Sequence, residues 1–517
     1  MIHLLPLASL LFASFIVFAT ANFFWASRQH ARRAKHLGCQ PPHKHAYKLL
    51  FGLDTMMRMI QADKRHQVPQ EAVKIYKEGG CPTFVLRMPG STNITTHDPK
   101  NIQAVLATQF HDFELGPRRR NNFFPMLGVG IFTADGKTWE HSRAILRPQF
   151  AREQVADLVS EERHVQTLLK HLPVDASGWT APTDLAPIFF RLTIDTATEF
   201  LFGDSINSQE AALAQDMSLM GPVAFNHTNV AESFDYGISC LGTRARLATL
   251  YWLYNPPSFR KAIREVHDFA DYCIERAAIP DASNKEKDGR YIFLKELLKV
   301  TDNRVDLRSQ LLNILLAGRD TTAGLLGWTF WELARHPQVF HRLRASILET
   351  FGPYDSHDKI TFAALKSCTY LQHVMNETLR LYPSVPLNAR QATRDTTLPR
   401  GGGPDGMSPV YVRRGQEVVY SVYVMHRRRD IWGPDADKFI PERWAGRKHG
   451  WEYIPFNGGP RMCLGQQFAL TEAGYVICRL LQRFDAIEKL DDSDAELHDY
   501  SLTTAPVSVN VRLHQAA

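Results

Sequence analysis

The first apolar stretch of the chain is long enough to cross a membrane. No charged residue interrupts Leu4 to Trp25, and a helix of this length, rising about 1.5 Å per residue, matches the roughly 30 Å of hydrocarbon in a bilayer. Four basic residues follow at once: Arg28, Arg32, Arg33 and Lys35. By the positive-inside rule they place the rest of the chain on the cytosolic side. The pattern therefore predicts an N-terminal membrane anchor over residues 1–27.

A cleaved signal peptide is the alternative interpretation of this stretch, because Ala19-Thr20-Ala21 is similar to a cleavage site. The missing basic n-region and the length of the apolar run favour the anchor. Behind it, Pro41 and Pro42 interrupt any helix. Residues 28–45 are therefore predicted to be a basic, proline-containing hinge.

Most of the remaining pattern is helical. Long apolar periodicity over Val305 to His336 and over Gly465 to Phe484 predicts two buried helices. Short β-like runs at Thr83 to Met88 and at Glu417 to Val424 predict strands. No low-complexity linker or repeat divides the chain from there on, so residues 46–517 are predicted to form one domain.

Composition excludes several classes of protein. The 517 residues are 44% hydrophobic and 22% charged, as in an ordinary globular chain. The net charge of +6 is too diffuse for a nucleic-acid binder, which would present a concentrated basic face. The seven cysteines are odd in number and lack a framework spacing, which indicates reduced thiols in a cytosolic environment.

One cysteine stands in a setting that suits metal chemistry. Phe456 to Gly465 reads FNGGPRMCLG, and Cys463 lies directly before the second predicted helix. A thiolate there would face the helix N-terminus, whose free N–H groups favour negative charge. The glycines would let backbone pass close to a flat cofactor. The alternative is a buried structural cysteine beside an ordinary turn.

The other predicted long helix is interrupted in its middle by small and polar residues, Ala317 to Thr322, with the sequence AGRDTT. Glycine lowers helix stability, and a buried carboxylate needs partners. Such a break is either a packing kink or a functional widening that holds water. Elsewhere, Glu377 and Arg380 lie three residues apart on a predicted helix, a weak signal alone, and Arg443 lies where it could complete a charged triad.

The cysteine loop resembles the haem-binding loop of the cytochrome P-450 family, F-x-x-G-x-R-x-C-x-G. All five fixed positions match: Phe456, Gly459, Arg461, Cys463 and Gly465. The resemblance implies that Cys463 is the axial ligand of a haem b iron and that Arg461 pairs with a haem propionate. It also implies a mainly α fold, with long helices around the haem, a small β-rich lobe and an N-terminal transmembrane helix.

Three further motifs match the family in the same chain order. Ala317 to Thr322 is similar to its oxygen-activation motif, which implies that Thr321 hydrogen-bonds dioxygen and that Asp320 brings protons from solvent. Trp139 and Arg143, four residues apart, match a W-x-x-x-R whose side chains contact a propionate, and Arg390 is a further propionate partner.

The third motif is structural. In the family, the groups at Glu377, Arg380 and Arg443 lock the core beneath the haem loop. The same resemblance points to a set of substrate-pocket residues: Phe124, Ala317, Val385, Leu387 and Thr503. For the stretch around Phe124, a loop closing over an apolar cavity and a core-packed loop remain equally open.

Several stretches look most like the fungal branch that hydroxylates n-alkanes and fatty acids. They are NNFFPMLGVGIFTADGKTWEHSRAILRPQF, PSVPLNARQATRDTTLPRGGGPDG and HRRRDIWGPDADKFIPERW. The resemblance implies terminal hydroxylation of a fatty acid, an alkane or a similar long alkyl chain. Tailoring hydroxylation in a fungal secondary-metabolite pathway is the alternative. A haem-thiolate isomerase or a non-catalytic haem binder is a third class, and the intact Asp320-Thr321 pair argues against it.

The resemblance also implies the reaction partners. Dioxygen is the co-substrate, and electrons come from NADPH through NADPH-cytochrome P-450 reductase, with cytochrome b5 as a further candidate. The implied location is the endoplasmic reticulum membrane, single-pass, with the catalytic domain in the cytosol. A basic group is either a docking face for an acidic reductase or a solvated charge run. Its members are Arg427, Arg428, Arg429, Arg447 and Lys448.

Overall fold

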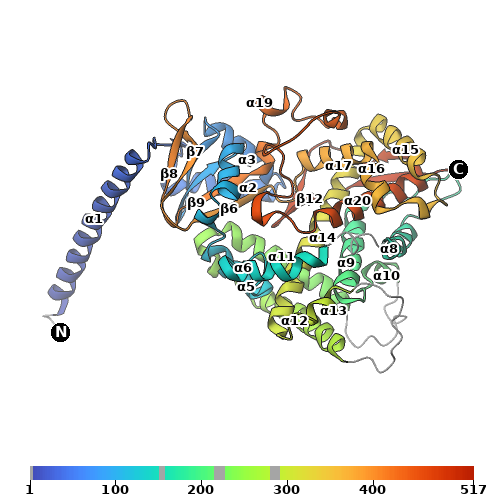
Figure 1. Cartoon of the computed structure of the whole chain (residues 1–517), viewed down its shortest axis with the longest axis horizontal. Coiled ribbons are helices and arrows are strands. Elements are labelled where there is room, and N and C mark those ends of the chain that lie inside the picture. Colours follow the sequence, from blue (N-terminus) through green and yellow to red (C-terminus); the bar gives the residue numbers. More distant parts are fainter. Residues whose placement is uncertain (1–3, 151–157, 215–226, 280–291) are drawn as a thin grey trace.

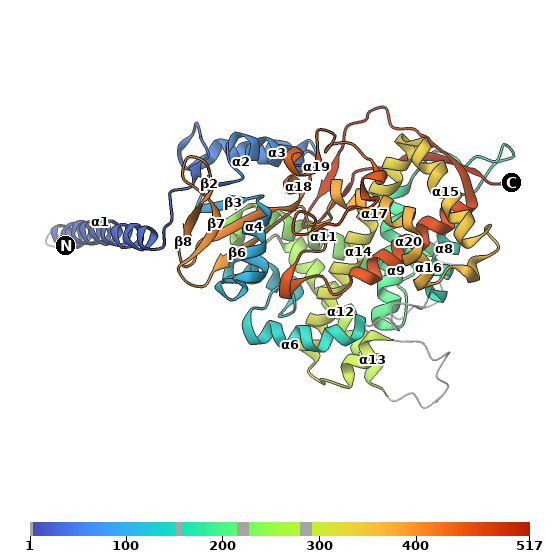
Figure 2. The same cartoon turned by 45° about the horizontal axis from the view of Figure 1, so that its top comes forward.

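The computed structural model describes residues 4–150, 158–214, 227–279 and 292–517. A part rich in strands lies next to the N-terminal helix, and a larger helical part extends from it to the C-terminus at the opposite end (Figure 1). The view in Figure 2 shows helix α14 running through the middle of the helical part. The predicted mainly helical architecture with a small β-rich lobe is therefore confirmed.

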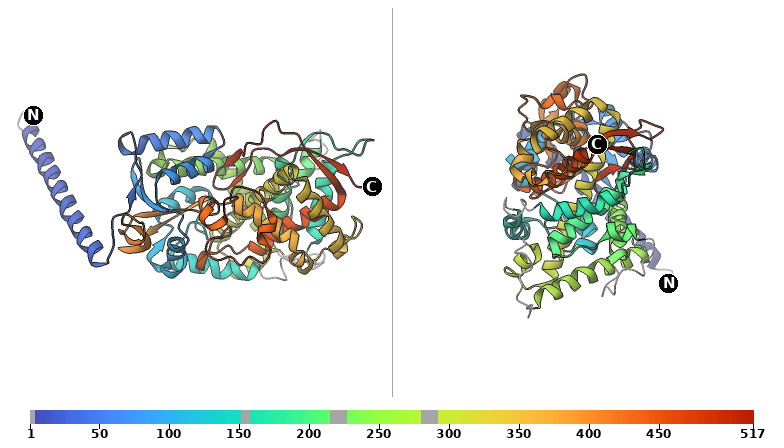
Figure 3. Two further views of the ribbon diagram at one scale, coloured as in Figure 1. Left: turned by 90° about the horizontal axis from the view of Figure 1, so that it is seen from above. Right: turned by 90° about the vertical axis from the view of Figure 1, so that its right-hand side faces the viewer.

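Helix α1 (Leu4–His36) stands away from the rest of the chain, as Figure 1 and the left view of Figure 3 show. Its aromatic residues from Phe12 to Trp25 are exposed, by 66% and 63% at these two ends. In the part of the chain that the structure describes, no helix has both the length and the apolarity needed to cross a membrane. The membrane anchor therefore stays a prediction.

The predicted hinge is tied to the β-rich part. Helix α1 extends through Arg28 to His36, and the backbone after it bonds to the β7–β8 hairpin. The Gln40 amide donates to the Pro409 carbonyl at 2.9 Å, and the Gly403 amide donates to the Pro41 carbonyl at 3.1 Å. These bonds fix the exit of α1 against the hairpin.

Six strands drawn from both halves of the chain form the main sheet, in the order β1-β2-β3-β9-β6-β4. Strands β2 and β3 form an antiparallel hairpin, and β3 pairs in parallel with β9, which joins the N-terminal and C-terminal parts of the chain. The bounds are β1 His43–Lys44, β2 Thr83–Met88, β3 Ser91–Thr96, β4 Phe113–Glu114, β6 Leu387–Ala392 and β9 Glu417–Ser421.

The strand predicted over Thr83–Met88 is confirmed as β2. The strand predicted to reach Val424 ends instead at Ser421, because the Ser421 hydroxyl accepts the Val424 amide at 3.1 Å and caps the short helix α18 (Val422–Met425). The remaining strands are β5 Thr183–Asp184, β7 Thr396–Gly402, β8 Ser408–Val412, β10 Phe484–Lys489, β11 His498–Tyr500, β12 Thr504–Pro506 and β13 Asn510–Gln515.

The helices make up most of the remaining fold. Those before the central helix are α2 Leu53–Lys64, α3 Val68–Glu78, α4 Pro99–Gln103, α5 Pro117–Leu127, α6 Gly136–Leu146, α8 Val159–Lys170, α9 Leu185–Phe202, α10 Ser208–Leu213, α11 His227–Arg246, α12 Pro257–Ala278 and α13 Phe293–Leu298. From the central helix onward they are α14 Arg304–Arg335, α15 Pro337–Phe351, α16 Phe362–Ser367, α17 Thr369–Leu381, α19 Arg429–Trp432 and α20 Gln466–Arg483.

Helix α14 is the centre of the hydrophobic core. The Asn303 side chain caps its start by accepting the Asp306 amide at 3.1 Å, and Pro337 follows its end. Nearly every residue along it is buried, as expected of a helix that is apolar all round. It packs against α9, α12, α17 and α20. Strand β12 crosses it at Gly324, where a Cβ would lie only 2.8 Å from the Thr504 carbonyl oxygen.

Candidate functional site

The cysteine loop is held in a single shape by its own backbone. The Cys463 amide donates to the Phe456 carbonyl at 3.0 Å, and the Met462 amide donates to the Gly459 carbonyl at 3.0 Å. Gly459 has φ +68°, and a Cβ there would lie 1.9 Å from the Leu106 carbonyl oxygen. Only glycine fits this position, since both its dihedral angle and its neighbour exclude a side chain.

Cys463 is exposed, but it does not behave like a surface thiol. Burial raises the pKa of the Cys463 thiol, and the Gly465 amide and the Arg143 guanidinium only partly oppose that rise. The Gly465 amide at the start of α20 lowers this pKa, as the sequence predicted, but desolvation of the sulfur outweighs it.

Four arginines gather beside the loop: Arg119, Arg143, Arg390 and Arg461. The Arg143 guanidinium donates to the Met462 carbonyl at 3.0 Å. Arg119 and Arg390 share one acceptor, the Asn388 side-chain oxygen, at 2.9 and 3.1 Å. Helices α5 and α6, strand β6 and the cysteine loop therefore bring these cations to one place.

Within the part of the chain that the structure describes, this cluster has one carboxylate ion-pair partner, Asp135, at 2.7 Å from the Arg461 guanidinium. Burial and repulsion by Arg390 lower the pKa of Arg461 to about 9. The same two causes lower the pKa of Arg119 to about 10. Buried cations that repel one another favour a ligand carrying negative charge. An exposed thiol beside them completes a donor set that fits a haem with two propionates.

Trp139 lies within this cluster, as the W-x-x-x-R spacing predicted. It is 6% exposed on helix α6, one turn before Arg143. The Arg461 guanidinium lies 4.3 Å from the centroid of its ring, and the Arg143 guanidinium lies 5.9 Å from it. The Trp139 ring therefore packs against two of the guanidinium groups and limits where they can point.

The interruption predicted at Ala317 to Thr322 is wrong, because helix α14 runs unbroken from Arg304 to Arg335. Ala317, Gly318 and Thr321 are only partly buried, whereas nearly all of their neighbours along the helix are buried. The Thr321 hydroxyl donates to the Ala317 carbonyl at 2.6 Å, and the Ser384 hydroxyl donates to the Thr321 carbonyl at 3.3 Å. The first of these bonds fixes the direction of the Thr321 hydroxyl, on a side chain that is only partly buried.

Asp320 is buried on the same stretch of α14 and belongs to an ion network. The Arg319 guanidinium binds the Asp320 carboxylate at 2.9 Å and also pairs with Asp235 on helix α11. Burial and the neighbouring Asp235 raise the pKa of Asp320 to about 6, although Arg319 opposes the rise. A carboxyl group with this pKa exchanges protons readily near neutral pH.

A second buried carboxyl group lies close by, at Glu472 on helix α20. It accepts the Thr196 hydroxyl at 2.5 Å, and burial raises its pKa to about 7. Sequence reasoning missed it. The apolar pattern on both sides of Glu472 was the signal that this side chain would be buried.

The charged triad predicted around Glu377 is formed. Arg380 binds both Glu377 oxygens, at 2.8 and 2.9 Å, and Arg443 lies 3.3 Å from one of them. The Trp444 indole and the Ile440 amide each donate to the carboxylate at 3.0 Å. The side chains of Glu377 and Arg380 are fully buried, so this is an internal lock between α17 and the segment before the cysteine loop.

The predicted pocket residues differ in how far their side chains are buried. Phe124 is 51% exposed and lines an outer pocket of about 380 Å³ together with residues of α12 and α14. Val385, Leu387 and Thr503 are half-buried. The loop predicted around Phe124 is wrong for residues up to Leu127, which belong to helix α5 (Pro117–Leu127), whereas the residues from Gly128 to Phe132 lie outside any helix.

Two arginines are less exposed than a surface charge would be. Arg119 is half-buried: its guanidinium donates to the Phe132 carbonyl at 3.2 Å and lies 5.3 Å from the Phe123 ring centroid. Its spacing from Phe123, one helical turn, was the available signal. Arg427, placed in a docking face, has a buried side chain that lies 3.7 Å from the Tyr423 ring centroid.

Comparisons with known proteins agree with this geometry. The family model described as "Cytochrome P450" matches residues 50–511. The chain is 50% identical to a protein named cytochrome P450 monooxygenase g430 from a Fusarium species, over 95% of this chain and 87% of that one. It is 52% identical to cytochrome P450 52A13 of Debaryomyces hansenii, over 86% of this chain and 85% of that one. The fold matches the crystal structure of a cytochrome P450DA heme domain with a TM-score of 0.72, at 22% identity, covering 93% of this chain and 97% of that one.

Proposed function

Since the chain belongs to the cytochrome P450 family and is a haem-dependent monooxygenase, we propose a class of substrate for it. The substrate is a fatty acid, an alkane or a similar long alkyl chain, and it is hydroxylated at or near its terminal carbon. The observation that supports this choice is the likeness of three long stretches to the fungal alkane and fatty-acid hydroxylating branch. Tailoring hydroxylation of a lipophilic secondary metabolite is the second candidate, because no residue of the chain excludes it and the chain is also 50% identical to the Fusarium monooxygenase.

The haem, when bound through Cys463, supplies the chemistry that activates dioxygen and transfers one oxygen atom to the substrate. We propose that the chain contributes four things besides shaping the loop and supporting it from beneath. Cys463 donates the thiolate, supported by its accessible sulfur in a rigid loop. Arg143, Arg390 and Arg461 bind the propionates, with Trp139 holding two of them in place. Phe456, Gly459 and Gly465 shape the loop.

The third contribution is proton control. Asp320 takes protons from solvent and passes them to the Thr321 hydroxyl, which holds them at the reacting end of the substrate pocket. The fourth is a pocket that excludes water, with Ala317, Val385, Leu387 and Thr503 in its wall and Phe124 at its outer end. Glu377, Arg380 and Arg443 hold the support beneath the loop.

Electrons would come from NADPH through a cytochrome P450 reductase, with cytochrome b5 as a further donor. The segment 4–25 would anchor the chain in the endoplasmic reticulum membrane, with residues 28–45 connecting it to one catalytic domain over 46–517. The uncharged N-terminal stretch and the projecting helix support this arrangement. Carbonate-washed membranes should retain the full chain and release a chain beginning at residue 28. Equal retention of both would contradict the anchor.

The substrate class is tested with the full-length enzyme, its reductase and NADPH. We expect fatty acids from lauric to oleic acid to shift the haem to the high-spin state, because an apolar chain displaces water from the iron, and to yield terminal hydroxy acids. n-Alkanes of the same lengths serve as matched substrates without a carboxylate. Omitting the reductase is the control and should abolish turnover. No spectral shift and no product with either series would reject an alkyl-chain substrate and leave the secondary-metabolite candidate.

Replacing Asp320 with asparagine tests the proton route. Because the pKa of Asp320 is raised to about 6, its proton-donating form is depleted as pH rises through 6. The wild-type kcat should therefore fall above that pH when proton delivery limits the rate. Asp320→Asn should lower kcat by about 100-fold and remove this pH dependence. Asp302 is exposed and lies just before α14, so Asp302→Asn is the matched control. A full wild-type profile in Asp320→Asn would contradict the route.

A further inference from the structure

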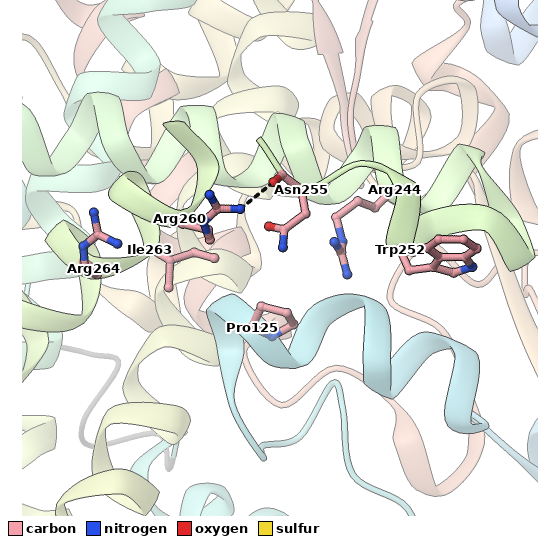
Figure 4. Close-up of a pocket in the computed structure, with 7 residues that line it drawn as sticks. All are labelled: Pro125, Arg244, Trp252, Asn255, Arg260, Ile263 and Arg264. Atoms are coloured by element: carbon pink, nitrogen blue, oxygen red, sulfur yellow. Dashed lines mark hydrogen bonds between the residues drawn. The ribbon is translucent and has the colours of Figure 1, made fainter. Parts of the chain in front are cut away.

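A cationic pocket lies on the outside of the helical part, away from the cysteine loop. It measures about 440 Å³ and lies between helix α5, helix α12 and the short helix η6 (Ala248–Leu253). Figure 4 shows Pro125 of α5 facing a row of side chains that includes Arg244, Arg260 and Arg264. None of the lining residues is acidic. The pocket therefore carries three positive charges and no negative one.

Arg244, at the end of α11, is the cation built most deeply into this pocket. It is only 5% exposed, and its guanidinium donates to the Asn122 side-chain oxygen at 3.0 Å and to the Tyr254 carbonyl at 2.9 Å. Both acceptors are neutral. Among the residues that the structure describes, no aspartate or glutamate forms an ion pair with any of the three arginines. A buried cation without a counter-charge is costly, so this arrangement favours an anionic ligand.

The other two arginines bring two more positive charges to the pocket, at the protein surface. Arg260 and Arg264 are exposed and lie four residues apart on one face of α12. Like charges at this spacing destabilise a helix unless something neutralises them. The Arg260 guanidinium donates to the Asn255 carbonyl at 2.9 Å, which holds it at the pocket as Figure 4 shows.

Large apolar side chains flank the pocket on η6. Trp252 is 61% exposed and lines the pocket itself, Leu253 is 60% exposed, and Leu250 is 43% exposed. Three exposed apolar residues within one short helix are unusual beside a charged pocket. Tryptophan beside arginine is typical of a lipid interface, where the indole lies among the head groups and the cations contact phosphate.

We propose that this pocket binds the phosphate head group of an anionic membrane phospholipid. Arg244, Arg260 and Arg264 neutralise the head group, and Trp252 and Leu253 lie among the adjoining lipids. The acyl chains stay outside the protein, because three of the residues that line the pocket are arginines, which favour the charged head group. This site is separate from the cysteine loop and does not depend on which substrate the enzyme oxidises.

The test uses the full-length holoprotein in nanodiscs of phosphatidylcholine that contain a small fixed fraction of phosphatidic acid with brominated acyl chains. Bromine quenches tryptophan only at short range, so the Trp252 signal, taken as the difference from Trp252→Phe, reports which lipids lie beside it. We expect stronger quenching by brominated phosphatidic acid than by the same fraction of brominated phosphatidylcholine. Each arginine should contribute about fivefold to this preference, and high salt should reduce it.

The double variant Arg260→Gln, Arg264→Gln should lose most of the preference. Lys261→Gln, Arg276→Gln removes two charges from the same helix outside the pocket and should keep it. Equal quenching by the two lipids, or equal preference in both double variants, would overturn the proposal. Two further measurements distinguish a phospholipid from free phosphate and from a fatty acid. Loss of the preference on adding inorganic phosphate, or an equal preference for a brominated fatty acid, would also overturn the assignment to a phospholipid.

Discussion

Cys463→Ser is expected to yield a protein whose reduced, carbon-monoxide-treated form lacks the long-wavelength Soret band that thiolate ligation produces. A serine hydroxyl stays protonated at neutral pH and donates far less electron density than a thiolate. Changes beside a metal ligand already cost 10- to 100-fold, so losing the ligand itself should lower turnover by more than about 100-fold. The loop would keep its shape, because its hydrogen bonds are made by backbone atoms.

Cys39→Ser is the matched control for this change. Cys39 is half-buried near the end of α1, far along the chain from the loop, and burial raises its pKa too. It should leave the spectrum and the turnover unchanged. An intact long-wavelength band or normal turnover in Cys463→Ser would mean that another residue ligates the iron, and the assignment of the whole loop would be wrong.

Glu377→Ala is expected to abolish haem incorporation and to destabilise the fold by about 3–5 kcal/mol, the usual cost of breaking a buried ion pair. The change leaves the Arg380 side chain, which is 0% exposed, without the Glu377 carboxylate as its counter-charge. The Trp444 indole and the Ile440 amide also lose the carboxylate oxygens that accept their hydrogen bonds. The support beneath the cysteine loop would then rearrange. The ratio of haem to protein and the Tm of the purified protein measure the two effects.

Glu296→Ala is the control with the same spacing. Glu296 pairs with Lys299 three residues later at 2.6 Å, but Lys299 is 68% exposed and Glu296 35%. An exposed pair of this kind contributes no more than about 1 kcal/mol, so haem content and Tm should hardly change. Normal holoprotein from Glu377→Ala would show that the buried triad does not support the haem site.

The features that sequence predicted well depend on local pattern. The period of the apolar residues identified α14, and the short β-like run from Thr83 to Met88 identified β2. The loop around Cys463 could be recognised because its glycines meet a requirement of the backbone itself. At Gly459 that requirement is visible as a close contact with Leu106.

The features that sequence missed depend on tertiary contacts. Whether an arginine is solvated or buried is decided by partners far along the chain: Asn388 for Arg119, and Glu496 for Arg427. The pKa of Cys463 is set by desolvation from the surrounding fold rather than by the adjacent helix alone. Helix α5 forms where a loop was expected because Pro117, at its first turn, suits a helix start.

The contact between Gly459 and the Leu106 carbonyl also bears on the order of folding. Leu106 belongs to the first quarter of the chain and Gly459 to its last eighth, so the contact closes a loop that spans most of the chain. Closing such a loop carries an entropic cost that only a nearly complete structure offsets. The cofactor cradle is therefore completed only once the last eighth of the chain is present, and a shorter nascent chain has no finished place for a prosthetic group.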